Sequence, residues 1–150
     1  MSVTDIAMTN VRFAVSVHVL ALLAVTEGPC TSEFIAGSVS TNPVVIRRLL
    51  GTLQRAGLVI GRTGPRGGFL LARPARDIRL DQLHRLIAEG NVSTASHSPN
   101  FRCPVGRVVT DVVDRIGTRA EKAFLEALAR ETLADVVRDV RGRMESCKPK

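Results

Sequence analysis

The stretch that decides the fold runs from Asn42 to Arg73 and reads N-P-V-V-I-R-R-L-L-G-T-L-Q-R-A-G-L-V-I-G-R-T-G-P-R-G-G-F-L-L-A-R. Its first half has the signals of an amphipathic helix. Asn42 can cap the N-terminus, Pro43 suits the first helical position, and Gly57 can end the helix. Apolar residues recur at helical spacing and predict one buried stripe, made of Ile46, Leu49, Leu50, Leu53 and Ala56.

The residues after Gly57 predict a β-hairpin. Leu58-Val59-Ile60 and Phe69-Leu70-Leu71 are β-prone runs, and residues 63–68 between them form a turn rich in Gly and Pro. Because Arg66 occupies the tip of this turn, we expect it to project from the domain. A helix followed by such a hairpin is typical of a recognition helix with its wing.

The residues before Asn42 complete a helix-turn-helix. Thr31 or Ser32 can cap a short helix, and Ser40-Thr41 can form the turn into the next one. The apolar side of the short helix would comprise Phe34, Ile35 and Val39. In such a unit the second helix enters the major groove of duplex DNA by its N-terminal end.

We therefore predict a DNA-binding surface that comprises Ser32, Thr41, Asn42, Val44, Arg47, Arg48, Arg62 and Arg66. Arginine can donate to both acceptors of a guanine, and a valine methyl group can touch thymine. Asn42, Val44, Arg47 and Arg48 would read bases or set the helix in the groove. Ser32 and Thr41 would contact phosphates, and Arg62 and Arg66 would belong to the wing. The simpler alternative is that these arginines only form a solvated helix face.

Composition agrees with a nucleic-acid partner. The chain has 150 residues, 45% of them hydrophobic, a net charge of +7 and a pI near 10.6. Nine arginines lie between Val44 and Arg85, against Asp77 and Asp81. The chain has no Trp or Tyr and only five Phe, whereas single-strand and RNA binders commonly stack bases on exposed aromatics. Duplex DNA is therefore the expected partner.

We expect a cytoplasmic protein without a membrane segment. The apolar run Val15–Val25 is too short to span a bilayer, and its helical spacing predicts the first core helix, with His18 buried in it. Residues 1–9 carry no basic residue of the kind that begins a signal peptide. Three cysteines far apart in sequence suit reduced thiols rather than a disulfide framework.

The second half of the chain is predicted to be helical. Leu80–Glu89 is a short amphipathic helix, Pro104 opens a long one with an apolar face, and Thr132 can cap a last one. The predicted organisation is a winged helix-turn-helix domain (1–90), a loop (91–103), a helical dimerisation region (104–143) and a polar tail (144–150). The fold class is mainly α with a small β-hairpin wing. A long apolar-faced helix favours a homodimer, although it could instead fold back on its own wing domain.

Short strings spread over almost the whole chain are specific in their order and spacing. They are T-S-E-F-I-A from Thr31, A-G-L-V from Ala56, G-P-R-G-G-F-L-L-A-R from Gly64, I-R-L-D-Q-L from Ile78, and E-G at Glu89. They resemble the Rrf2 family of bacterial winged helix-turn-helix regulators, which includes IscR-, NsrR- and CymR-type proteins. T-N-P-V-V-I-R-R from Thr41 and C-P-V-G from Cys103 look most like the cluster-free, YwnA-like branch. The resemblance implies homodimeric, sequence-specific DNA binding, generally repression, with the wing in the minor groove and a long helix at the dimer interface.

The chain departs from the cluster-binding members of this family. Those members carry three cysteines in the loop before the long helix, whereas residues 90–102 contain none here and Cys103 stands alone. We therefore expect no cofactor and no iron–sulfur cluster. Cys103 precedes Pro104 at a helix N-terminus, which favours a reactive thiolate, so Cys103 and Cys30 are candidates for oxidant sensing. The alternative is that Cys103 is an unreactive thiol.

Two other classes of function were considered. The three histidines are scattered and the chain has no nucleophile elbow, phosphate loop or metal-ligand spacing, so we expect no enzyme. The other alternative is a winged-helix module that binds, or is regulated by, a protein partner. A module of that kind would not show a steep dependence of DNA binding on salt.

Overall fold

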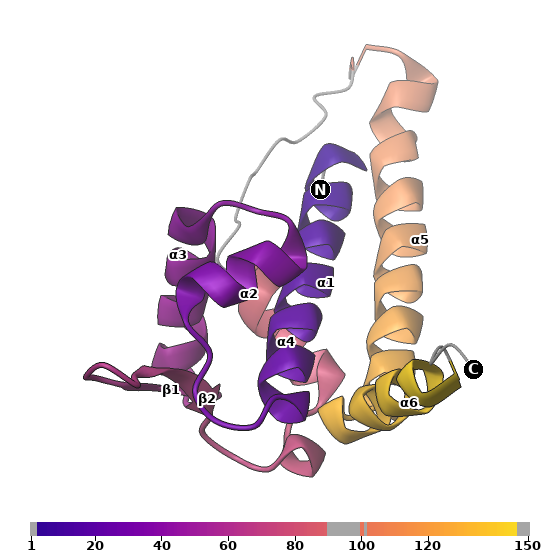
Figure 1. Ribbon diagram of the computed structural model, residues 1–150. Coiled ribbons are helices and arrows are strands. Elements are labelled where there is room, and N and C mark those ends of the chain that lie inside the picture. Colours follow the sequence, from indigo (N-terminus) through magenta and orange to yellow (C-terminus); the bar gives the residue numbers. More distant parts are fainter. Residues whose placement is uncertain (1–2, 90–99, 101, 147–150) are drawn as a thin grey trace.

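The computed structural model describes residues 3–89, 100 and 102–146 of the chain. Its elements are, in order, α1 (Val3–Val25), α2 (Ser32–Val39), α3 (Pro43–Arg55), β1 (Val59–Arg62), β2 (Gly68–Leu71), the 3-10 helix η1 (Ala75–Asp77), α4 (Leu80–Glu89), α5 (Pro104–Leu128) and α6 (Leu133–Ser146). The two strands form one antiparallel hairpin (Figure 1). The expected class, mainly α with a small β-hairpin wing and a long helix, is confirmed.

The hydrophobic core is shared by α1, α2, α3, α4, α6 and the hairpin. The predicted stripe of α3 is buried there, because Ile46, Leu50 and Leu53 are each 0% exposed and Leu49 is 7% exposed. From α1 the core receives Val19, Leu20 and Leu23. Burial of one face fixes α3 rotationally, so its other face must point to solvent.

The hairpin is tied to the body of the domain by Cys30. The backbone N–H of Cys30 donates to the carbonyl of Phe69 at 3.0 Å, and the N–H of Phe69 donates to the carbonyl of Cys30 at 2.8 Å. Gly68 has a φ of 150°, and a Cβ atom there would lie 2.7 Å from the Cys30 carbonyl oxygen. Glycine is therefore needed for the wing to approach the body this closely.

The helix ends follow the predicted caps. Thr31, rather than Ser32, caps α2, because its hydroxyl accepts from the N–H of Phe34 at 3.2 Å. The side-chain oxygen of Asn42 accepts from the N–H of Val44 at 2.8 Å and so caps α3. At the start of α6 the Thr132 hydroxyl accepts from the N–H of Asp135 at 3.3 Å, while the Asp135 carboxylate accepts from the N–H of Thr132 at 2.9 Å.

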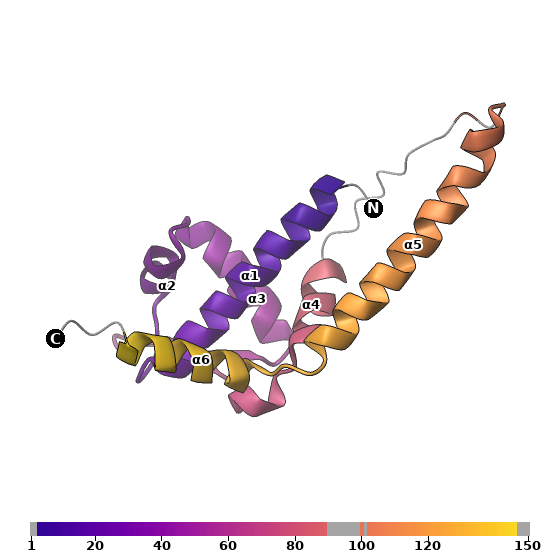
Figure 2. The same cartoon turned by 90° about the vertical axis from the view of Figure 1, so that its right-hand side faces the viewer.

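Helix α5 stands away from the rest of the molecule, as Figure 2 shows. None of its 25 residues is buried, and it is continuous through Gly117. It touches the body mainly through α4, where the Phe124 ring lies 5.0 Å from the His84 ring, which in turn lies 5.3 Å from Phe13 of α1. The long helix therefore does not fold back over its own wing domain.

Helix α6 returns to the winged domain. The N–H of Leu133 donates to the carbonyl of Ile78 at 2.8 Å, and Leu133 and Val137 lie in the shared core. The helix runs to Ser146, three residues past the predicted helical region 104–143, and it packs with residues 1–90 rather than with α5. The predicted loop 91–103 is described only at residues 100, 102 and 103, while His97 and Cys147 lie outside the described residues.

Two side chains lie where the sequence pattern did not place them. His18 is exposed rather than buried, and its Nε2 lies 3.0 Å from the hydroxyl of Ser38. Phe34 is 53% exposed, because α2 buries Ile35 and Ala36 and so turns the preceding residue away from the core. In the described stretches, 3–89 and 104–146, we find no helix with the length and apolarity of a membrane span.

Candidate DNA-binding surface

The N-terminal half of α3 is exposed on the side opposite its buried stripe. Val44 is 48% exposed and Val45 is 51% exposed, and Arg47 and Arg48 are exposed beside them. Figure 1 shows α3 and the hairpin on the same side of the molecule, with α5 on the other side. The four predicted residues of this helix end, from Asn42 to Arg48, are therefore brought together at one accessible place.

Arg47 is held by the first turn of α2. Its Nε donates to the Ser32 hydroxyl at 3.2 Å, and its Nη2 donates to the Glu33 carboxylate at 2.6 Å. The hydrogen bond from Arg47, the largest cause, holds the pKa of Glu33 below its ordinary value of 4.5. The Arg47 side chain is still 55% exposed, so it remains within reach of a ligand.

Arg48 differs from its neighbour. Within the described part of the chain its guanidinium makes no side-chain hydrogen bond or ion pair, and only its carbonyl is engaged, by the Thr52 hydroxyl at 3.3 Å. An unengaged guanidinium at a helix face can turn toward a base or a phosphate at little cost in broken contacts.

The two predicted phosphate contacts lie in different surroundings. Ser32 is only 7% exposed, and its hydroxyl is committed to Glu33 and Arg47. A direct contact with a phosphate would require that hydroxyl to change partners. Thr41 is half-buried in the turn before α3, where its N–H donates to the carbonyl of Ala36 at 3.0 Å. Both phosphate contacts remain predictions.

The wing carries two exposed arginines. Arg62 ends β1 and Arg66 lies in the turn, which is closed by a hydrogen bond from the Gly67 N–H to the Gly64 carbonyl at 2.9 Å. Ile60 on the same hairpin is 45% exposed. The projecting part of the hairpin is therefore basic.

Other arginines of the basic segment support the fold. Arg73 donates to the carbonyls of Gly57 at 3.0 Å and Ala56 at 3.3 Å, which closes the C-terminal end of α3. Arg79 donates twice to the buried carboxylate of Asp81, at 3.0 Å each. The charge available to a ligand is thus smaller than a count of arginines suggests, and it is concentrated on α3 and the wing.

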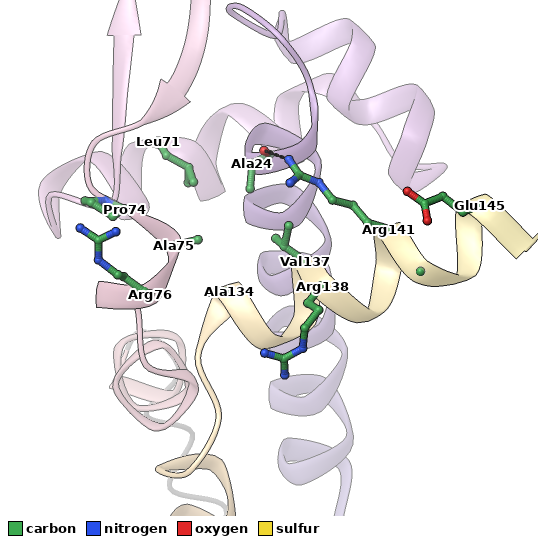
Figure 3. A pocket seen from close by; sticks show the side chains of 11 residues that line it. Ala24, Leu71, Pro74, Ala75, Arg76, Ala134, Val137, Arg138, Arg141 and Glu145 are labelled. Carbon is green, nitrogen blue, oxygen red and sulfur yellow. Dashed lines mark hydrogen bonds between the residues drawn. The ribbon is translucent and has the colours of Figure 1, made fainter.

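A hollow lies away from this surface, where α6 meets the base of the wing. This hollow of about 740 Å³ is lined in part by small side chains, among them Ala24, Ala75 and Ala134 (Figure 3). Two arginines at its rim are already engaged. Arg138 pairs with Asp135 at 2.8 Å, and Arg141 donates to the carbonyl of Ala24 at 3.4 Å. The hollow contains none of the predicted site residues.

The two candidate redox residues are not brought together within the chain. Cys30 is 2% exposed beneath the wing, whereas Cys103 is exposed at the start of α5. Helix α5 has 25 residues and so is roughly 37 Å long. Cys103 lies at the end of α5 remote from α6 and the wing base (Figure 2). A disulfide needs Cα atoms within about 7 Å, so this arrangement does not allow one between Cys30 and Cys103 of the same chain.

A capped helix-turn-helix, an exposed basic helix end and an arginine-bearing hairpin together define a winged helix-turn-helix transcription regulator. The family model described as Rrf2, iron-dependent transcriptional regulator, matches residues 9–139. The chain is 37% identical over 131 residues to YwnA of Bacillus subtilis strain 168, which is named as an HTH-type transcriptional regulator. That alignment covers 87% of this chain and 97% of YwnA. The chain therefore belongs to the Rrf2 family, which confirms the resemblance.

Solved structures agree with this assignment. A crystal structure from Lactobacillus plantarum, named as a transcriptional regulator, matches with a TM-score of 0.72 and 27% identity, covering 87% of this chain and 89% of that one. A crystal structure named as a DNA-binding protein matches with a TM-score of 0.66 and 33% identity, covering 83% and 97% respectively. The Rrf2 family and YwnA are transcriptional regulators rather than enzymes, as expected.

The family description raises the question of iron. Among the described residues no group of three or more His, Cys, Asp or Glu is placed to hold a metal ion. The segment 90–102 contributes His97 but no cysteine, and Cys30 is buried beneath the wing. Within the described residues the thiols of Cys30 and Cys103 are not brought together, whereas an iron–sulfur cluster needs several thiolates around one centre.

Proposed function

We propose that this chain is a homodimeric repressor that binds specific duplex DNA in the cytoplasm and needs no iron–sulfur cluster. The observation that carries the proposal is the exposed, basic N-terminal half of α3 beside the arginine-bearing wing. An α-helix fits the major groove, and its N-terminal residues then meet the base edges. The wing would place Arg62 or Arg66 at the adjacent minor groove. Where the DNA sequence makes this groove narrow, its negative potential is stronger and attracts arginine.

Each residue of the helix end would have a distinct role. Arg47 and Arg48 would donate to guanine O6 and N7, and Val44 would contact a thymine methyl group. Asn42, which already caps α3, would help to set the helix in the groove, and Ser32 and Thr41 would contact the phosphates. The Ser32 hydroxyl would then donate to a phosphate in place of Glu33 while it still accepts from Arg47.

The dimer is supported by the exposed apolar face of α5. Six large apolar side chains on this helix are between 39% and 66% exposed: Val105, Val108, Val112, Val113, Ile116 and Phe124. A second copy of the same helix would cover them, because a two-fold interface places the same patch on both subunits. Two copies paired in this way would present two α3 helices to inverted half-sites.

Repression follows from occupancy, since a dimer bound across a promoter excludes other proteins from that DNA. We propose Cys103 as the regulatory input, because it is exposed and precedes α5. Peroxide would oxidise its thiolate to sulfenic acid, with transfer of one oxygen to sulfur and release of hydroxide. Buried Cys30 would react only if the wing opened or a partner copy approached it.

The test is fluorescence anisotropy of the purified chain on DNA from upstream of its own gene and on random duplex, across a salt series. The proposal expects a preference for the upstream DNA and a logarithm of the binding constant that falls linearly with the logarithm of salt. Repetition with mild peroxide should change the affinity in the native chain but not in a Cys103→Ser chain. No preference and a flat salt response would instead indicate a protein partner for the wing.

A further inference from the structure

Glu33 is an acidic residue in the middle of a surface that should attract phosphates. It lies in the first turn of α2, and its side chain is 62% exposed. A carboxylate at such a place repels the DNA backbone, so its position has to be explained by what it contacts. Its contact is Arg47 of α3, at 2.6 Å.

The geometry of this contact uses one edge of the Arg47 guanidinium. Nε donates to the Ser32 hydroxyl and Nη2 donates to the Glu33 carboxylate. These two nitrogens lie on the same side of the planar group. The Ser32 hydroxyl also lies 3.1 Å from each carboxylate oxygen of Glu33. Because Ser32 is buried, this edge of the arginine is held at a packed position of α2.

The other edge of the guanidinium remains unused. Of its five N–H donors, two are engaged, which leaves three on Nη1 and Nη2. Two outward donors from this edge match the O6 and N7 acceptors of a guanine. The Arg47 side chain is 55% exposed with these contacts made, so the protein does not enclose it.

We propose that Glu33 is a positioning residue that orients Arg47 to read one guanine in each half-site without itself touching DNA. The inference rests on the proposed DNA-binding function and adds a specificity residue to it. A long arginine side chain loses considerable rotamer freedom on binding, and the contacts with Glu33 and Ser32 remove that freedom beforehand. Discrimination at that base pair therefore depends on Glu33, whereas attraction to DNA in general does not.

The experiment first selects preferred duplexes from a randomised pool with the native chain. Competition anisotropy then measures affinities for the selected duplex, for each single-base-pair variant of it and for random duplex. The chains compared are the native chain, Arg47→Ala, Glu33→Gln and Glu33→Asp. The matched control is Glu131→Gln, because Glu131 is an exposed glutamate in the link between α5 and α6. Circular dichroism and thermal unfolding establish that each variant is folded.

The expected result is a loss of discrimination at one base pair. The native chain should prefer guanine there by about 5- to 150-fold, the range of one bidentate contact, and Arg47→Ala should abolish this preference. Glu33→Gln and Glu33→Asp should both lower it toward the Arg47→Ala value, since the shorter Asp keeps the charge but cannot keep the contact. Their affinities for random duplex should not fall, and Glu131→Gln should behave like the native chain.

Other results would overturn the inference. Glu33 has no positioning role if Glu33→Gln keeps full discrimination at the base pair that Arg47→Ala loses. Glu33 also has no positioning role if its two variants lose discrimination equally at every base pair of the selected duplex. The same holds if Glu33→Asp discriminates like the native chain. If the native chain enriches no sequence from the pool, the proposed function itself fails and this inference fails with it.

Discussion

Two helices of this chain have the same kind of sequence and opposite surroundings. Helix α3 and helix α5 both carry an apolar stripe at helical spacing beside charged residues. In α3 the stripe is buried, with Ile46, Leu50 and Leu53 at 0% exposure. In α5 the stripe is exposed, since Val105 is 66% exposed and Ile116 is 57% exposed. An apolar stripe therefore indicates that one face of a helix will be buried. It does not indicate whether the same domain or another chain buries that face.

The difference assigns the two helices to different tasks. Because the apolar side of α3 is used within the domain, its charged side is presented outward beside the wing. Because most of the apolar side of α5 is exposed in the described part of the chain, it is the surface available for a second copy. Substitutions on the two helices and at their neighbours should break this contrast, and the largest effect is expected on folding.

The largest effect is expected in the stripe of α3. Leu50→Ala should lower the free energy of unfolding by about 2–5 kcal/mol, because it leaves a cavity in a fully buried site. Urea denaturation followed by circular dichroism measures this loss. Val44→Ala, on the exposed side of the same helix, should change the stability by no more than about 0.5 kcal/mol. Equal losses for both variants would contradict the assignment of faces.

The stripe of α5 should govern association rather than folding. Ile116→Asp should raise the dimer dissociation constant by about 100-fold or more, because each copy loses the burial of an isoleucine, worth about 1.5–3 kcal/mol. Sedimentation equilibrium measures this change, and circular dichroism should show an unchanged helix content. The matched control is Thr118→Asp on the polar side of α5. An unchanged dissociation constant for Ile116→Asp would remove α5 from the interface.

The exposed side of α3 should carry specificity. Arg48→Ala should weaken binding to a preferred duplex by about 1–3 kcal/mol if Arg48 contacts a guanine, with a smaller effect on random duplex. Competition anisotropy on both duplexes gives the comparison. Equal weakening of binding to the preferred duplex and to random duplex would indicate that Arg48 contacts a phosphate instead of a base.

The wing should contribute attraction without much specificity. Arg66→Ala should weaken binding to all duplexes by a similar factor and reduce the slope of log K against log salt by about one. The same salt series with Arg76→Ala serves as a control, because Arg76 is an exposed arginine of η1 outside the predicted surface. A loss confined to one sequence would show that the wing reads bases.

The smallest effect is expected at His84, where the winged domain meets α5. Burial is the main cause that lowers the pKa of His84 below 6.5, and the Glu121 carboxylate opposes this shift. The folded chain therefore binds fewer protons than the unfolded chain in this range, and stability should fall as the pH drops through 6.5. Unfolding of the native chain and of His84→Gln at pH 7.5 and 5.5 tests this. The variant should lose less stability on acidification, and an equal loss would exclude His84 as the cause.

Much of the fold could be predicted from the sequence because its signals are local. Asn42-Pro43 and Gly57 bound α3, Thr132 caps α6, and the Gly/Pro turn sets the hairpin. These features depend on residues only a few positions apart, so they can be seen before any tertiary structure is known.

The site could be predicted only in part, because its details depend on contacts between distant residues. The pair Glu33–Arg47 spans 14 positions and forms only because α2 and α3 cross. The same holds for Arg73, which reaches back 16 positions to the carbonyl of Gly57 and so supports the fold. The T-S-E string at the start of α2 contains Ser32 and Glu33 but gives no indication of their partner.

The central claim is that α3 reads DNA while α5 pairs two copies, and one measurement tests both parts. The native chain should be used to select duplexes from a randomised pool. We expect an inverted repeat, with two half-sites about one helical turn apart or a multiple of that distance. Enrichment of a single unpaired half-site would contradict the role of α5, and the absence of any enriched sequence would contradict the role of α3.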